Sequence, residues 1–496
     1  MNSLQKSLLL LLLLFCAAAV FFVFCHNSGY GYDALEYLVI GRSLIEGYSF
    51  YDFIPSKSWG LYTLVAGYLS LGNVANHLGI TTLITSLFIL MVTGTFLVTA
   101  RQFGRLSALA SAALVGLCAM FTEMNYLEPE SLVFLSGLAA FYLLTKNDNI
   151  TSAQLYGAGL WLGIGFAFKS VAAFYFIGVA FFLLVRRIPD GYLALGRRII
   201  EVAFLSAGFG TALVIPMVYF GVTDRLFDHI QWTYFFPLLR RPADIFYLGK
   251  LLAKLSWFIV LFGAALIASL RADIRWRVYA GPTNRLALAM GLASFLALLK
   301  QQASHYAFPG VAFCSIFIGG VLAGMYLDAN FRQRLRTLTF AMLGIGALAV
   351  ASILIYNPNA LNRLTTFRNF RYETESARFI RDRVGPNQHA LFFKHSTLLY
   401  WLSHRYPNIP FLKLDVQETY ALGGRPGLLE KALKDPTMQL VEYDSEWPGI
   451  QDRDFGTDPV SRSILHTFHG TLVSDFVEIE PGLPPYTFWL RRSETL

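Results

Sequence analysis

The chain has 496 residues, of which 55% are hydrophobic and only 15% are charged, with a mean hydropathy of +0.49. A soluble protein carries about a quarter charged residues, so the composition excludes a soluble globular protein and indicates a polytopic membrane protein. The formal charge of +8 arises in residues 1–356, which hold 24 Lys and Arg against 15 Asp and Glu, whereas the remainder holds 16 against 17. The excess therefore belongs to membrane loops and gives no indication of nucleic-acid binding.

The first predicted element is a membrane span over residues 7–25, which follow Lys6. Its apolar residues are enough to cross about 30 Å of hydrocarbon. A cleaved signal peptide ending near Ala17–Ala19 is the alternative, and it is disfavoured because the apolar run continues beyond that point. The four cysteines lie in or beside predicted spans, and their spacing indicates neither a zinc site nor a disulfide framework.

Apolar runs and their flanking Lys and Arg residues predict eleven spans in all. They lie near 7–25, 79–100, 107–121, 131–145, 153–168, 170–185, 199–220, 251–270, 285–299, 306–327 and 337–356. The stretch over 153–185 is too long for one helix and is divided at Lys169. This division places the Lys- and Arg-rich loops on the cytoplasmic side, with the N-terminus, and the residues after the last span outside.

The composition changes near residue 357, where charged residues become ordinary in frequency. Helices are predicted at 373–384, 396–405 and 427–434, and strands at 389–394, 410–414 and 439–443, followed by β-rich runs over 471–479 and 486–491. Alternating strands and helices are typical of a small α/β domain. The predicted architecture is a polytopic α-helical membrane domain over 1–356, with its first outer loop at 26–78, and an extracytoplasmic soluble α/β domain over 357–496.

The placement of charge argues against a coupled transporter. Ionisable groups inside a bilayer normally mark an ion or proton pathway, but the predicted span interiors are nearly free of charge. No pair of Gly- or Pro-broken spans occupies matched positions in two halves, which is the pattern expected for alternating access. A carrier of an uncharged substrate remains open, but chemistry at the outer interface fits better.

Carboxylates gather where two spans meet the outer face. Asp33 and Glu36 follow the first span, and Glu128 and Glu130 begin a later one. Residues three apart share one face of a helix, and the sequence from Ala34 to Gly47 has helical apolar spacing with a glycine stop. A solvated amphipathic surface helix would explain the first pair without any chemistry. Two such clusters on one side of the membrane favour a reaction at that face.

The motif Asp33-Ala-Leu-Glu36-Tyr37-x5-Arg42-x-Leu44-x2-Gly47-Tyr48-x-Phe50 resembles the first outer loop of bacterial GT-C membrane glycosyltransferases. These are the protein O-mannosyltransferases, the lipid A aminoarabinose transferases and related enzymes (glycosyltransferase family 39-related). Further similar segments are Leu127–Leu132, Gly163–Lys169, Lys300–Pro309 and the tail after the last span. The chain departs from the pattern at Ala34, where many relatives carry a second acid, and at Lys57–Gly60.

The resemblance implies an inverting transferase that moves a sugar from a polyprenyl-phosphate donor to an acceptor at the outer face of a bacterial inner membrane. The acceptor is a lipid, a glycan or a protein. An attacking hydroxyl has to lose a proton, which requires a base within hydrogen-bond reach. Asp33 is the candidate base, and Glu36, Glu128 and Glu130 complete the predicted catalytic group.

A leaving phosphate requires cations, and seven side chains are candidates. They are Arg42, Lys57, Lys169, Arg240, Arg241, Lys300 and His305. Interfacial anchoring is the alternative for Lys169, Lys300, Arg240 and Arg241, and helix capping is the alternative for His305. Stacking on the sugar or acceptor is predicted for Tyr32, Tyr37, Trp59 and Tyr306.

Carboxylates at positions 33, 128 and 130 could hold a hard cation such as Mg²⁺. No spacing requires one, and cationic side chains can neutralise a phosphate, so no obligatory metal is expected. Two other functions remain open. A polysaccharide polymerase or ligase would share the lipid-linked donor but normally places its largest outer loop between spans. A membrane carrier or flippase would not depend on Asp33.

Overall fold

The computed structural model describes residues 3–326 and 371–492, with gaps in both parts. The gaps cover residues 54, 56, 73–75, 148, 187–193, 236–244, 272–274, 276–277, 280, 300–302, 393–395, 410–427, 443–458 and 480–486. The predicted span at 337–356 and the predicted domain boundary at 356/357 lie outside the described residues. The predicted strand at 410–414 also falls in a gap.

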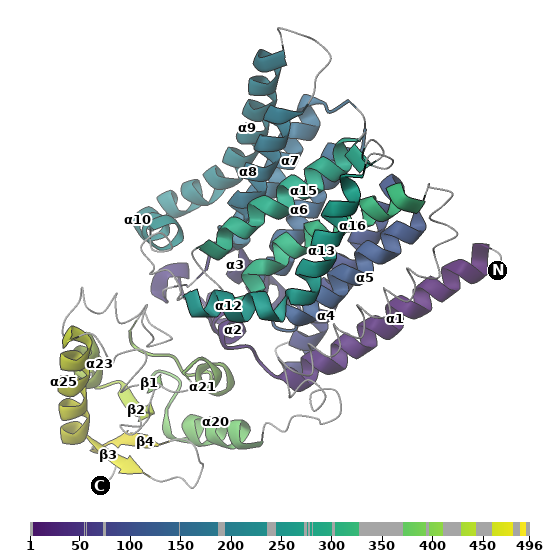
Figure 1. Cartoon of the computed structure of the whole chain (residues 1–496). Helices are drawn as coiled ribbons and strands as arrows, with labels where there is room; N and C mark the ends of the chain where they lie inside the picture. Colours follow the sequence, from purple (N-terminus) through teal and green to yellow (C-terminus); the bar gives the residue numbers. More distant parts are fainter. Residues whose placement is uncertain are drawn as a thin grey trace.

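The first part is a bundle of helices (Figure 1). Its helices are α1 (Ser3–Ser28), α2 (Tyr32–Ile45), α3 (Trp59–Leu69), α4 (His77–Phe103), α5 (Arg105–Phe121), α6 (Pro129–Thr145), α7 (Ser152–Phe168), α8 (Ala172–Val185), α9 (Ala194–Val222), α10 (Leu226–Ile230), α12 (Ile245–Lys254), α13 (Ser256–Ser269), α15 (Pro282–Ser294) and α16 (Phe308–Tyr326). Short 3-10 or π turns lie at η1 (Phe50–Asp52), η3 (Gln231–Phe235), η4 (Phe295–Leu299) and η5 (Ser304–Ala307).

Small residues bring the long helices into close contact. A Cβ atom at Gly159 would lie 1.9 Å from the Leu205 carbonyl oxygen, and one at Gly208 would lie 1.9 Å from that of Tyr156. Glycine at these two positions therefore lets α7 and α9 pack backbone against backbone. Close approach of this kind is how membrane helices gain dispersion energy, because lipid offers no hydrophobic driving force between them.

Several helices are apolar and long enough to cross a membrane. By length and composition these are α4, Leu195–Val222, Pro282–Leu299 and Ser304–Met325. Two bent helix pairs would raise the number to six: Leu14–Ser28 with Asp33–Ile45 at 85°, and Leu248–Lys254 with Ser256–Ser269 at 70°. The described residues thus support a helical membrane protein, and the total of eleven spans stays a prediction.

The second part contains a four-stranded mixed sheet. Its elements are α20 (Arg371–Arg383), β1 (His389–Phe392), α21 (Ser396–Ser403), α23 (Leu428–Lys434), β2 (Met438–Glu442), α25 (Pro459–Asp475), β3 (Phe476–Ile479) and β4 (Phe488–Arg491). The strand order is β1-β2-β4-β3, with β1 parallel to β2 and the other pairs antiparallel. The helices and strands predicted on either side of the gaps are confirmed in kind. The β-rich run predicted over 471–479 is confirmed at Phe476–Ile479, which form β3. It is wrong over 471–475, which belong to α25, because Phe468 and Leu472, four residues apart, bury one face of that helix.

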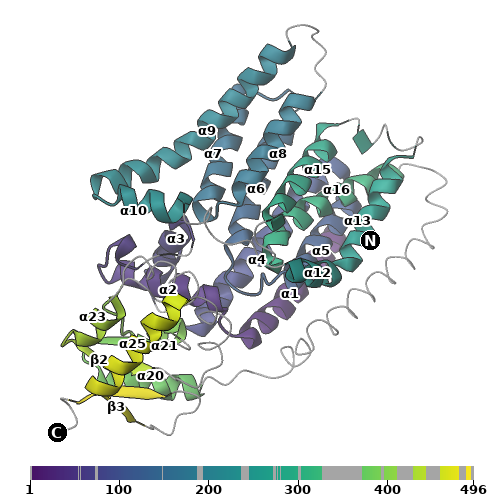
Figure 2. The ribbon, with the colours of Figure 1, turned by 60° about the vertical axis from the view of Figure 1, so that its left-hand side comes forward.

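The two parts meet beside α2 (Figures 1 and 2). The Arg42 guanidinium lies 3.5 Å from the centre of the Trp401 ring and donates a hydrogen bond to the Trp401 carbonyl oxygen at 2.5 Å. Tyr48 and Tyr406 add an aromatic contact with ring centres 5.3 Å apart. The helix that carries Asp33 and Glu36 is therefore held on one side by α21 of the second part. The sequence predicted α2 but not α3, which it left within the first outer loop.

Candidate active site

Asp33 lies in the first turn of α2, directly after the bend that follows α1. The Lys57 ammonium, in the segment leading to α3, lies 3.2 Å from its Oδ2. The Asp33 side chain is 30% exposed, and that of Lys57 only 7%. The sequence predicted these two residues for one site, and the structure brings them together as a carboxylate open to solvent beside a largely buried cation.

Glu36 lies on the same face of α2, as its spacing from Asp33 predicts, but it has a different environment. It is buried and accepts a hydrogen bond from the Tyr62 hydroxyl at 2.6 Å. The same hydroxyl accepts a hydrogen bond from the Lys57 backbone amide at 3.1 Å. Glu36 is thus connected through Tyr62 to the segment that presents Lys57, which is a positioning contact.

The second carboxylate pair lies at the start of α6. Glu128 is the N-cap residue, and Pro129 occupies the first helical position, where its missing amide hydrogen is not needed. Glu130 is fully buried and accepts a hydrogen bond from the ammonium of Lys169, the residue that ends α7. The predicted turn at Lys169 is therefore confirmed, and it brings this lysine into the carboxylate cluster.

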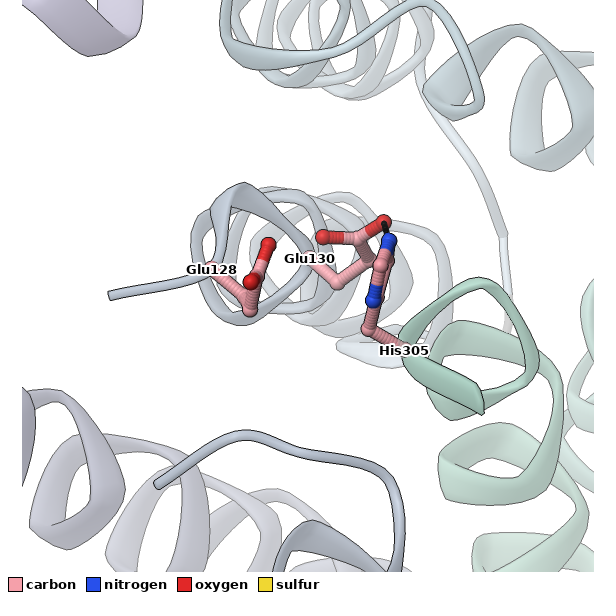
Figure 3. A group of neighbouring side chains, drawn as sticks. All are labelled: Glu128, Glu130 and His305. Carbon is pink, nitrogen blue, oxygen red and sulfur yellow. Dashed lines mark ion pairs between the residues drawn. The ribbon is translucent and has the colours of Figure 1, made fainter. Parts of the chain in front are cut away.

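His305 approaches the same carboxylates from η5. Its Nε2 lies 4.0 Å from Glu130 Oε1. Figure 3 shows Glu128 and Glu130 projecting from the start of one helix while His305 reaches them from another. The four predicted residues Glu128, Glu130, Lys169 and His305 thus form one buried group, although they come from three separate segments of the chain.

Two further charged residues extend the cluster. Glu123 Oε2 lies 3.4 Å from His305 Nδ1, and Glu123 Oε1 accepts a hydrogen bond from the Lys254 ammonium at 3.4 Å. Lys254 also donates to the Ser304 hydroxyl at 3.2 Å. The sequence analysis did not assign Lys254 to the site. Its signal was a charged residue near the start of the otherwise apolar stretch over 251–270.

Burial and neighbouring charges shift the pKa values of Glu128 and Glu123 in opposite directions. Desolvation raises the pKa of Glu128 to about 7, assisted by the negative charges of Asp33 and Glu130 and opposed by His305 and Lys169. Burial also acts to raise the pKa of Glu123, but the hydrogen bond from His305 and the charge of Lys254 outweigh it and lower that pKa to about 2. Near neutral pH the site therefore holds one glutamate that exchanges its proton readily and one that stays ionised.

Glu128, Glu130 and His305 could hold a metal ion. Each offers one ligand atom, and these atoms lie within 4.8 Å of one another. Glu128 Oε2 and Glu130 Oε2 are buried and have no hydrogen-bond partner among the described residues. Two carboxylates and an imidazole fit a divalent cation such as Mg²⁺ or Zn²⁺. The Lys169 ammonium already occupies one oxygen of Glu130, so a metal would compete with it.

The predicted aromatic contacts have mixed outcomes. Tyr37 is fully buried and packs edge-on against Tyr62 with ring centres 5.6 Å apart, so its ring is covered and its stacking on a sugar stays a prediction. Tyr306 lies beneath the Lys169 ammonium, 3.7 Å from it. Trp59 is half-buried at the start of α3. Tyr32 begins α2, but its side chain lies outside the described residues.

Three of the remaining predicted cations lie outside the described residues, and the fourth contacts the second part of the chain. Arg240, Arg241 and Lys300 fall within the gaps in the described residues. Arg42 is 8% exposed and is engaged by the ring and carbonyl of Trp401, so its guanidinium joins the two parts of the chain. Its predicted contact with a leaving phosphate is therefore wrong in this conformation.

The arrangement can take up a proton and stabilise an anion at one place. Asp33 is accessible and can accept a hydrogen bond from a hydroxyl. The Lys57 ammonium carries a positive charge beside this carboxylate, and it can neutralise an incoming phosphate. In the buried group, Lys169 pairs with Glu130 and His305 lies beside Glu123, so these charged side chains are held in place near Asp33 and Lys57. Geometry of this kind suits group transfer from a phosphate to a hydroxyl or amide.

Solved structures with a similar fold are membrane glycosyltransferases. ArnT from Cupriavidus metallidurans bound to undecaprenyl phosphate has a TM-score of 0.56 at 14% identity, and the match covers 87% of this chain and 93% of that one. The archaeal oligosaccharyltransferase AglB from Archaeoglobus fulgidus, in complex with an inhibitory peptide and a dolichol-phosphate, has a TM-score of 0.54 at 12% identity, covering 99% and 75%. No protein-family model matches the chain, and no curated protein matches its sequence. Both structures are GT-C enzymes, so the chain has the fold of the GT-C membrane glycosyltransferases, as the resemblance of its first outer loop predicts.

Proposed function

We propose that the chain is an inverting glycosyltransferase that moves a sugar from a polyprenyl-phosphate-linked donor to a lipid, glycan or protein acceptor. The observation that carries this proposal is the accessible Asp33 carboxylate held beside Lys57, near the buried group of Glu128, Glu130, Lys169 and His305. The GT-C fold supports it. ArnT binds undecaprenyl phosphate and AglB binds a dolichol-phosphate, which are polyprenyl phosphates of the proposed class.

In the proposed reaction, an acceptor hydroxyl or amide attacks the anomeric carbon of the sugar. The proton of the attacking group passes to an Asp33 carboxylate oxygen. The bond between the anomeric carbon and the phosphate oxygen breaks, and its electron pair leaves with the polyprenyl phosphate. Attack from the face opposite the leaving group inverts the anomeric centre.

Lys57 is the cation that meets the developing phosphate charge in this proposal. A charge-assisted hydrogen bond from an ammonium to a phosphate oxygen is roughly twice as strong as a neutral one. Glu36 and Tyr62 hold the Lys57 segment in place. The Lys169–Glu130 pair is buried, so we assign it to fixing the charge of the site instead of to direct phosphate contact.

We propose that the Asp33 end faces outward in a bacterial inner membrane. The acidic residues of the site and a group of basic residues lie at opposite ends of the helices. Helix α6 runs from Glu130 at the site to Lys146 at its other end. Arg101 and Arg186 share the Lys146 end. The positive-inside rule makes that end cytoplasmic. Alkaline phosphatase fused after Leu496 would be active in this orientation. If that fusion is inactive, and a fluorescent protein fused at the same position fluoresces in the cytoplasm, the proposed orientation is wrong.

The decisive experiment compares cell-envelope lipids, glycans and proteins by mass spectrometry. Cells lacking the protein are complemented with wild type, Asp33→Asn or Glu46→Gln. Glu46 is an exposed acid at the far end of the same helix, about 20 Å from Asp33 at 1.5 Å per residue, and it serves as the matched control.

A sugar that is missing in the null, and restored by wild type and Glu46→Gln but not by Asp33→Asn, supports the transferase and identifies the acceptor. If Asp33→Asn also restores the missing sugar, Asp33 is not the base, and a membrane carrier becomes the favoured function. A null strain with an unchanged envelope would count against any transferase of this class.

A further inference from the structure

An apolar pocket of about 220 Å³ lies between α8 and α15. The two helices touch at Gly178, where a Cβ atom would lie 2.8 Å from the Ala289 carbonyl oxygen. Beyond this contact, toward Arg186 and Arg285, the pocket opens between the helices. Arg186 ends α8, and Arg285 lies in the first turns of α15, so the pocket lies at the opposite end of α8 from Lys169 and the candidate active site.

The walls of this pocket are apolar and open to the surroundings. Phe181 and Val185 of α8 are 59% and 56% exposed, and Leu292 of α15 is 49% exposed. Exposed apolar side chains on membrane helices face acyl chains, so an acyl chain can lie against these walls as far as the two arginines.

The arginines at the pocket have unused donors. Arg285 makes no hydrogen bond or ion pair within the described part of the chain, and its Nε is buried without a partner. Arg186 binds Glu201 through Nη2 at 2.5 Å, but its Nε is likewise buried without a partner. An unpaired buried donor on a charged group costs free energy, so both guanidinium groups favour an anionic ligand.

The charges around the pocket are unbalanced. Arg197 and Arg198 lie beside Arg186, through an ion pair to Glu201 at 3.4 Å and a hydrogen bond to the Arg186 carbonyl oxygen at 2.8 Å. Among the residues that the structure describes here, Arg285 brings the number of guanidinium groups to four, against the one carboxylate of Glu201. The N-terminus of α15, beside Arg285, adds further positive potential.

We propose that this pocket binds one anionic glycerophospholipid of the bilayer. The lipid phosphate accepts hydrogen bonds from Arg285 and Arg186, and an acyl chain lies along Phe181 and Leu292. A free phosphate would satisfy the arginines but would leave the apolar walls without an occupant. The site is separate from the proposed donor site, because it lies at the other end of α8.

Native mass spectrometry of the detergent-solubilised full chain tests this proposal. The protein is titrated with phosphatidylglycerol or with phosphatidylcholine of the same acyl chains. Arg285→Gln removes the charge without touching any described contact. Arg105→Gln is the matched control, because Arg105 is an exposed arginine at the same end of the bundle, at the start of α5 and outside the pocket.

Wild type is expected to bind its first phosphatidylglycerol at least fivefold more tightly than phosphatidylcholine. Arg285→Gln is expected to weaken phosphatidylglycerol binding about tenfold, the size of one charge-assisted hydrogen bond, and Arg105→Gln to leave it unchanged. Leu288→Trp narrows the apolar part of the pocket and keeps the charges of its arginines, so it is expected to weaken the binding of both lipids. Equal binding of the two lipids, equal losses in Arg285→Gln and Arg105→Gln, or no loss in Leu288→Trp would overturn the proposal.

Discussion

The Lys57 ammonium lies 3.2 Å from the carboxylate of Asp33, 24 residues earlier in the chain, and the pair joins the start of α2 to the segment before α3. The Asp33 side chain remains partly exposed, whereas Lys57 is almost covered. An incoming phosphate would therefore meet a cation whose position is already fixed.

Lys57→Gln is expected to weaken binding of undecaprenyl phosphate about tenfold, because one charge-assisted hydrogen bond to phosphate is lost. Titration of the purified protein with this lipid, followed by thermal shift, measures the change. Lys146→Gln is the control, because Lys146 is an exposed lysine at the other end of α6. Unchanged affinity in Lys57→Gln would take Lys57 out of the phosphate site.

Tyr62→Phe is expected to lower kcat about tenfold while changing KM for the donor by less than threefold. It leaves the buried Glu36 carboxylate and the Lys57 amide without their shared partner, which costs roughly 1–3 kcal/mol. Tyr68→Phe in the same helix is the control, since Tyr68 donates to the Gly79 carbonyl oxygen away from the site. If both variants lose stability and neither loses kcat, the Tyr62 contact only stabilises the fold.

The pKa of Glu128, raised to about 7 by burial, predicts how stability changes with pH. The folded chain binds this proton more tightly than the unfolded chain, so the free energy of unfolding falls as pH rises from about 4.5 through 7. The total change is on the order of 3 kcal/mol, and Glu128→Gln should remove it. Thermal unfolding of both proteins from pH 5 to pH 8 measures the difference.

Glu123→Gln provides the control for this pH series. The pKa of Glu123 is lowered to about 2, so its stabilising contribution is lost only as pH falls from about 4.5 toward 2. Glu123→Gln should therefore keep the wild-type slope between pH 5 and pH 8. Parallel curves for wild type and Glu128→Gln would show that Glu128 does not carry the proton.

A double-mutant cycle tests the buried pair of Lys169 and Glu130. Lys169→Met and Glu130→Gln are each expected to cost about 3–5 kcal/mol, because each removes the partner of a buried group. The double variant should cost clearly less than the sum, since no uncompensated charge remains. Additive losses of stability in denaturant unfolding would show that the two side chains do not depend on each other.

Removal of divalent metal ions is expected to leave the transfer rate within twofold of its starting value. Lys169 already pairs with Glu130, and the pKa of Glu128, raised to about 7 by burial, reduces the negative charge of the buried group near neutral pH. Dialysis against a chelator, followed by a transfer assay, measures this. Loss of activity that Mg²⁺ or Zn²⁺ restores would assign the Glu128, Glu130 and His305 group to a metal.

The sequence predicted the helical architecture and much of the candidate site because both depend on local patterns. Apolar runs located the helices, and Glu128-Pro129-Glu130 at the start of one of them fixed its direction toward the site. The turn at Lys169 followed from the length of the apolar stretch and the placement of basic loops.

The missed features depend on contacts between distant segments. The sequence does not show that α12 places Lys254 beside Glu123. Nor does it show that α21 places Trp401 against the Arg42 guanidinium. Tyr37 has the residue type of a sugar platform, but its place on α2 relative to Tyr62 buries the ring. The helix α3 was missed because its eleven residues are too short to register as a span.

The 85° bend between α1 and α2 sets how substrates would be supplied to Asp33. If α1 crosses the bilayer, a turn of this kind at a break of at most four residues would place the Asp33 carboxylate at the depth of the lipid headgroups. A donor carried on a polyprenyl chain would then reach the base by lateral diffusion in two dimensions, without its chain leaving the bilayer. The rate of supply would depend on the surface density of the carrier lipid, and turnover would respond to membrane fluidity as well as to the total amount of donor.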